Sequence, residues 1–89
     1  MPEDELELLH GHLEATGERP VETTASRYLG EAEAVVADAL APGTPESVVR
    51  ERVAQARDLL SHVEGTGDQT ADEHVDAARV LCDALLDDE

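Results

Sequence analysis

Apolar residues recur along most of this chain at the three-to-four-residue spacing of an amphipathic helix. The clearest example lies in residues 44–67, where one face would carry Val49, Val53, Ala56, Leu60 and Val63. Thr44 and Pro45 are typical of a helix start, because the threonine oxygen can accept a free amide and proline needs no hydrogen bond there. Gly65 is expected to end this helix in the left-handed conformation.

Three other segments repeat the pattern more weakly. The first contains Leu6, Leu9 and Leu13 on one face. The apolar face of the second segment consists of Ala25, Leu29, Ala32, Val36 and Ala39. The apolar face of the last segment consists of Val75, Ala78, Leu81, Cys82 and Leu85. Thr70, followed three residues later by Glu73, fits a capping box at the start of the last helix.

Glycine and proline separate these segments, which leaves short connections between them. The sequence therefore predicts a single domain, residues 1–89, with helices at about 3–16, 21–41, 45–64 and 71–86. Short connections favour antiparallel neighbours, so the expected fold is an all-α antiparallel four-helix bundle.

The chain also resembles itself. Residues 12–17 (HLEATG) match residues 62–67 (HVEGTG) at four of six positions with an offset of 50. Residues 31–40 match residues 76–85 at five of ten positions with an offset of 45. Two duplicated helical hairpins would explain both matches. Chance similarity between acidic, alanine-rich helices is the alternative.

Charge is the most unusual feature of the composition. The chain has 22 Asp and Glu residues against six Arg and no Lys, which gives a net charge of −16. Such a charge opposes compaction in dilute buffer, whereas at molar salt the screening length falls to ~3 Å. The composition therefore predicts a protein that folds in concentrated salt. An acidic, partly disordered chain is the alternative, and the helical periodicity favours the folded form.

The same composition limits the classes of partner and location. Direct nucleic-acid binding is not expected, because phosphate contacts come from basic residues. No apolar run approaches the ~20 residues that span a bilayer, so no membrane association is expected. The first residues have no basic segment typical of a signal peptide. A single cysteine, Cys82, excludes an intramolecular disulfide, and the predicted location is cytoplasmic.

Few residues suggest chemistry. His10 and His12 are two apart and would point to nearly opposite sides of a helix. His62 and His74 could face each other across the turn between the last two helices, which leaves open whether they bind a metal. Without a third convergent ligand, the sequence assigns no metal site, cofactor or catalytic residue. Cys82 lies on an apolar face and is expected to be buried.

One resemblance would give the chain an enzymatic function. Gly30-Glu31-Ala32-Glu33, together with residues 55–62, resembles the all-α nucleotide pyrophosphohydrolases and the phosphoribosyl-ATP pyrophosphohydrolases. The resemblance implies magnesium bound by Glu31, Glu33 and Asp58. The chain departs from the family pattern because Ala34 and Gln55 stand where carboxylates would be needed. A degenerate or minimal relative, with those three carboxylates in one pocket, is therefore the alternative function.

A second resemblance covers most of the chain. Residues 26–40, 46–60 and 70–81 resemble a family of small acidic haloarchaeal proteins of unassigned function. This resemblance implies a helical fold and a cytoplasmic location, and it supplies no catalytic residue. The leading interpretation is a non-enzymatic module that binds a protein partner or itself, for example as a homodimer. A core built from Ala and Val leaves apolar faces that a partner could cover.

Overall fold

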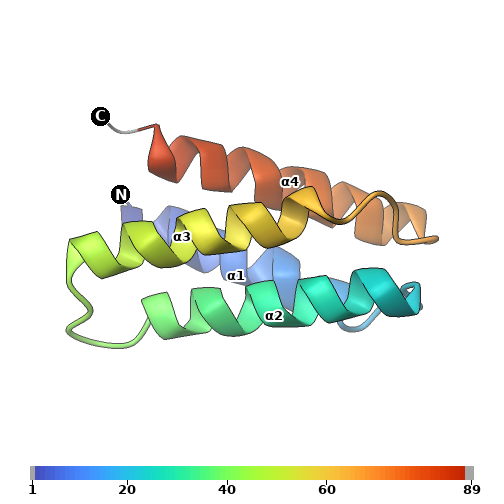
Figure 1. The fold of residues 1–89 in the computed structure, drawn as a ribbon, viewed down its shortest axis with the longest axis horizontal. Helices are drawn as coiled ribbons and strands as arrows, with labels where there is room; N and C mark the ends of the chain where they lie inside the picture. Colours follow the sequence, from blue (N-terminus) through green and yellow to red (C-terminus); the bar gives the residue numbers. More distant parts are fainter. Residues whose placement is uncertain (1, 88–89) are drawn as a thin grey trace.

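The computed structural model describes residues 2–87, with side chains from residue 4 onward. This part of the chain contains four helices and no strand: α1 (Pro2–Thr16), α2 (Thr23–Ala39), α3 (Glu46–Ser61) and α4 (Gln69–Leu86). Successive helices run antiparallel, and the start of α1 and the end of α4 lie at the same end as the α2–α3 connection (Figure 1). The predicted four-helix bundle is confirmed. None of the described helices combines the length and hydropathy needed to cross a bilayer.

The core is formed by the predicted apolar faces. Each helix contributes a stripe of buried residues, among which are Leu9, Val36, Leu60 and Cys82. α1 packs chiefly against α4, and α2 packs chiefly against α3. Small side chains occur repeatedly at these contacts, and alanines allow two helix axes to approach closely. Leu81 and Leu85, which the pattern placed in the core, are only partly buried at its edge.

Two of the predicted helix caps are wrong. The Thr44 hydroxyl donates to the Ala41 carbonyl (2.6 Å) instead of accepting an amide of α3, whose first flanking residue is Pro45. α4 begins at Gln69, because the Asp68 carboxylate accepts the Ala71 amide (2.9 Å). A carboxylate is a stronger acceptor than the hydroxyl of Thr70, so the helix starts at the earlier cap.

The predicted end of α3 also shifts. The helix ends at Ser61, and residues 63–66 continue without regular structure, so Gly65 is not its left-handed terminator. The left-handed glycines are Gly43 (φ 81°) and Gly67 (φ 82°), which turn the chain in the two connections on either side of α3.

Arginines from neighbouring helices satisfy the carbonyls at two helix ends. Arg79 of α4 donates to the Leu60 carbonyl at the end of α3 (2.8 Å) and also to the carbonyl of Val63. Arg50 of α3 donates to the Leu86 carbonyl at the end of α4 (3.1 Å). Each positive side chain lies at the negative end of the neighbouring helix dipole. The two antiparallel helices therefore cap one another.

The two halves of the bundle have related patterns of burial. Four buried positions of α2 coincide with four of α4 at an offset of 46, and the pairs are Ala25 and Ala71, Leu29 and Val75, Ala32 and Ala78, and Val36 and Cys82. The capping residues Glu22 and Asp68 have the same offset. The buried positions therefore align one residue away from the offset of 45 at which the letters match, because letter identity on two alanine-rich helices does not fix which face is buried. Duplication of a helical hairpin stays a prediction.

Candidate functional site

The end of the bundle at which residues 17–22 and 62–68 meet is closed by hydrogen bonds. Arg19 makes a two-pronged contact with the Asp68 carboxylate, at 2.9 Å from Nε and 3.1 Å from Nη2. The Glu22 amide donates to the Thr66 carbonyl (2.8 Å), so the two connections are joined directly. The Thr66 side chain is fully buried and lies 2.8 Å from the Asp72 carboxylate. We call this the closed end.

These contacts affect the ionisation of the capping carboxylates. The hydrogen bond from Arg19, followed by that from the Ala71 amide, lowers the pKa of Asp68 below its ordinary value. The Ala25 amide lowers the pKa of Glu22 in the same way. Both side chains are therefore charged acceptors at neutral pH, and their contacts serve the fold of the closed end.

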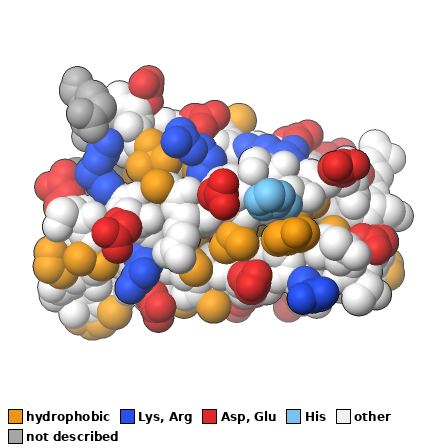
Figure 2. All heavy atoms as spheres, viewed as in Figure 1, with side chains coloured by type: hydrophobic (Ala, Val, Ile, Leu, Met, Phe, Trp, Pro, Cys, Tyr) orange, Lys and Arg blue, Asp and Glu red, His pale blue; other side chains and the backbone are white. Residues whose placement is uncertain are grey.

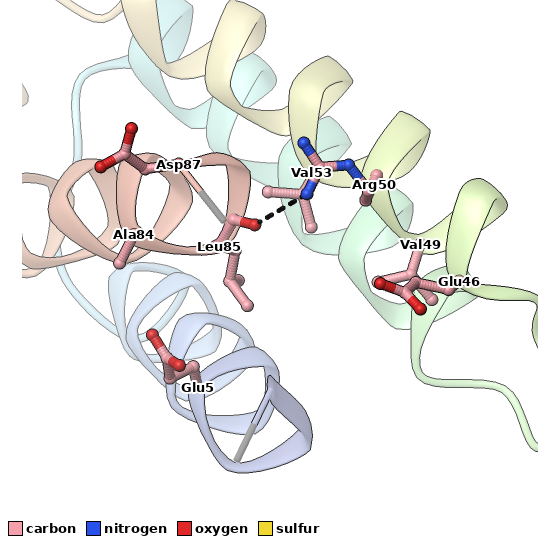
Figure 3. A pocket seen from close by; sticks show the side chains of 8 residues that line it. All are labelled: Glu5, Glu46, Val49, Arg50, Val53, Ala84, Leu85 and Asp87. Carbon is pink, nitrogen blue, oxygen red and sulfur yellow. Dashed lines mark hydrogen bonds between the residues drawn. The ribbon is translucent and has the colours of Figure 1, made fainter. Parts of the chain in front are cut away.

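The opposite end is hollow, and we call it the open end. A cleft of about 480 Å³ lies between α1, α3 and α4. Its apolar lining is Val49, Val53, Ala84 and Leu85. Figure 3 shows the Leu85 side chain pointing into the space between the labelled residues of α1 and α3.

Carboxylates surround this apolar lining. Glu5, Glu46 and Asp87 also line the cleft, together with Arg50. The Arg50 guanidinium donates to the Leu85 carbonyl, as Figure 3 shows, and also to the Leu86 carbonyl. A second hollow of about 420 Å³ shares Glu46 and Val49 with the first, and it extends the surface to α2 and the α2–α3 connection. No histidine or cysteine is among the described residues that line either hollow. The open end can therefore accommodate apolar groups within an acidic rim.

The three carboxylates of the proposed magnesium site do not form a metal-binding group. Asp58 belongs to α3, and its side chain is 78% exposed, while Glu31 and Glu33 belong to α2. Within residues 2–87, no three His, Cys, Asp or Glu side chains lie together in a way that could hold a metal ion. The convergence that the pyrophosphohydrolase alternative requires is absent from this part of the chain.

The histidines pair differently from the prediction. His62 stacks on Tyr28 of α2, with ring centroids 5.2 Å apart and planes at 17°. His74 instead contacts His12 of α1, with 2.9 Å between the two Nδ1 atoms. The possible contact between His62 and His74 does not form, because each ring instead contacts a ring on the neighbouring antiparallel helix. The sequence repeat relates His12 to His62 at the offset of 50, but the offset of 46 that relates Tyr28 to His74 comes only from the buried positions of the structure.

Cys82 is buried in the core, as predicted. Burial raises the pKa of its thiol to about 11, with a further contribution from the neighbouring Asp83 carboxylate. The thiolate is the reactive form of cysteine, so this side chain acts as an apolar filler at neutral pH.

Comparison with known proteins gives a family without an assigned role. No curated protein and no solved structure matches the chain. A family model described as a domain of unknown function (DUF8152) matches residues 5–89, which is nearly the whole sequence. The chain therefore belongs to the DUF8152 family.

Proposed function

We propose that this protein is a non-enzymatic helical module that binds a protein partner or a second copy of itself through the open end. The observation that carries the proposal is the cleft of about 480 Å³ whose apolar lining comes from α3 and α4. Concave, largely apolar surfaces with a few polar groups at their edges are typical of binding sites. Apolar side chains from a partner would displace water from Val49, Ala84 and Leu85.

The chemistry of the described side chains favours binding over catalysis. The one thiol is buried, and the open end presents carboxylates and an arginine that already contacts backbone carbonyls. The pyrophosphohydrolase alternative gains no support, because Glu31, Glu33 and Asp58 are not gathered into one metal-binding group.

The acidic rim determines how salt should affect each form of association. Two copies that meet at the open end bring Glu5, Glu46 and Asp87 close to their counterparts, so self-association requires screening. A basic partner is attracted by the same rim, so salt weakens that complex. We include in the proposal a cytoplasm rich in salt, which the net charge of −16 and the absence of lysine support.

Light scattering in 2 to 3 M KCl, with a matched pair of variants, tests the proposal. Ala84→Gln places a larger neutral side chain in the cleft, whereas Ala54→Gln makes the same change on the exposed surface of α3. We expect Ala84→Gln to weaken association at least tenfold and Ala54→Gln to leave it unchanged. Both substitutions preserve the net charge, so a difference in association between the two variants depends on the shape of the cleft and not on charge.

Two results would contradict parts of this proposal. A protein that stays monomeric at concentrations up to about 1 mM would exclude self-association at the open end. A dissociation constant of about 1 mM corresponds to a binding free energy of only about 4 kcal/mol. Equal association of the two variants would exclude the cleft as the contact surface. A basic protein added at low salt gives a third measurement. Binding of that protein to the unchanged chain and its loss in Ala84→Gln would identify a basic protein partner, instead of a second copy, as the occupant of the cleft.

A further inference from the structure

We propose that His12 and His74 form a two-histidine site for a divalent transition-metal ion, which would connect α1 to α4. The site lies away from the open end, so it neither requires nor supports the proposed interaction function. Imidazole is a ligand that Cu²⁺, Ni²⁺ and Zn²⁺ accept readily.

The geometry brings the two nitrogens almost to the separation that one ion requires. The Nδ1 atoms are 2.9 Å apart, the ring centroids are 5.1 Å apart and the ring planes are tilted by 47°. Two nitrogens bound to one tetrahedral ion at ~2.0 to 2.1 Å lie about 3.4 Å from each other. An increase of about half an ångström in this separation, with each ring rotated so that its Nδ1 lone pair points at the ion instead of at the other nitrogen, would therefore admit the ion.

Binding of a metal ion to the neutral histidine pair moves one proton to another nitrogen and releases no proton overall. In the neutral pair, one histidine donates its Nδ1–H and the other accepts at Nδ1, so the two rings are opposite tautomers. When a metal ion takes both Nδ1 lone pairs, the donor ring carries its proton on Nε2 after exchange with solvent. Protonated imidazole has no such lone pair, so acid competes with the metal.

The two rings lie in the interface between two helices. Both side chains are partly buried between α1 and α4, which pack closely against each other. His74 lies in the second turn of α4, and His12 lies one turn before the end of α1. Within residues 2–87 no third His, Cys, Asp or Glu completes the group, so water would fill the other positions. Binding should accordingly be weaker than at a closed four-ligand site.

The other half of the bundle supplies an internal control. His62 has the position equivalent to His12, but it faces Tyr28 in a stacked arrangement and has no second imidazole beside it. His10 is a further histidine on α1 outside the pair. Removing either of these side chains leaves the two proposed ligands unchanged.

Isothermal titration with Ni²⁺ alone tests the site. We would use the full chain at pH of about 7.5, because acid competes with the metal, and in 2 M KCl, which suppresses nonspecific binding to surface carboxylates. We expect one equivalent to bind, with affinity reduced at least tenfold in His12→Gln and in His74→Gln. His10→Gln and His62→Gln should bind as the unchanged protein does.

Electron paramagnetic resonance of the unchanged protein with one equivalent of Cu²⁺ gives a second test that needs no variant. We expect hyperfine coupling to two nitrogen nuclei. Coupling to one nitrogen or to none would overturn the proposal, even if the histidine variants failed to fold. Undiminished Ni²⁺ binding in folded His12→Gln and His74→Gln would overturn it as well.

Discussion

Thr66 shows how one buried polar side chain stabilises the closed end. Its Oγ1 lies 2.8 Å from Asp72 Oδ1 and 2.9 Å from the Asp68 carbonyl, and it accepts the Asp68 amide at 3.2 Å. Thr16, its counterpart at the offset of 50, is also buried, but its hydroxyl donates only to the Leu13 carbonyl of its own helix (2.6 Å). The same residue type therefore has a tertiary role at one position and a local role at the other.

We expect Thr66→Val to lower the free energy of unfolding by about 1–3 kcal/mol, because it leaves the Asp72 carboxylate and the Asp68 backbone with fewer partners. Thr16→Val should lower it by less than about 1 kcal/mol, since the Leu13 carbonyl is a helix-end acceptor. Denaturant titration in 2 M KCl, followed by circular dichroism, measures both. Equal losses in the two variants would contradict the tertiary role of Thr66.

Among the helices, α4 depends on a cap that the sequence pattern missed. Asp68 is both the acceptor for the Ala71 amide and the partner of Arg19, so the start of α4 and the α1–α2 connection are stabilised together. Thr70 fits the capping-box pattern, yet it lies inside the helix. Which of two nearby acceptors caps the helix depends on what else each can contact. Arg19, the second partner of Asp68, lies 49 residues away along the chain, so a local pattern does not include it.

The lowered pKa of Asp68 predicts how the stability of the protein changes as the pH falls. The folded state lowers the pKa of this carboxyl, so its ionised form stabilises the fold. This stabilisation is complete at pH values above the ordinary aspartate pKa of ~3.9, and it is lost as the pH falls through the lowered pKa of the folded state. We expect Asp68→Asn, which keeps a capping oxygen, to be less stable than the unchanged protein at pH of about 7, with the difference shrinking in acid.

Denaturation midpoints at several pH values in 2 M KCl measure this difference. Acidification also reduces the repulsion among all other carboxylates, so only the gap between Asp68→Asn and the unchanged protein is informative. Glu73→Gln serves as the control, because it removes one negative charge from an exposed position of the same helix. The difference in denaturation midpoint between Glu73→Gln and the unchanged protein should vary less with pH. A gap for Asp68→Asn that widened in acid would contradict the assignment.

At the scale of the molecule, charge is distributed unevenly over the bundle. α1 contains five carboxylates and no arginine or lysine, whereas α3 contains three carboxylates and three arginines. The face in Figure 2 shows acidic and arginine side chains interspersed with apolar ones. Repulsion should therefore be concentrated on α1, where no positive side chain of the same helix offsets it.

We expect helicity to rise with KCl, and the salt requirement to fall most when charge is removed from α1. Glu7→Gln with Glu14→Gln removes two charges there, and Glu51→Gln with Asp58→Asn removes two from α3. Circular dichroism during a KCl titration should show a lower midpoint for the α1 pair than for the α3 pair. Unchanged helicity of the original protein down to millimolar salt would contradict the role of repulsion.

The sequence by itself determined the helices and their buried faces. Helical periodicity is a local property, so the stripe through Val53, Ala56 and Leu60 and the burial of Cys82 could be predicted from spacing alone. It also determined the charge, and with it the expected response to salt.

Only the tertiary structure decided the contacts made between helices. The pairing of His12 with His74 joins residues 62 apart, and the Asp68 cap depends on Arg19 from another connection. The cleft at the open end exists because the side chains of α1, α3 and α4 leave space there when the axes reach their packing distance. Spacing along one helix specifies which side faces inward, but not which residue of a neighbouring helix lies opposite, and that depends on relative position and rotation.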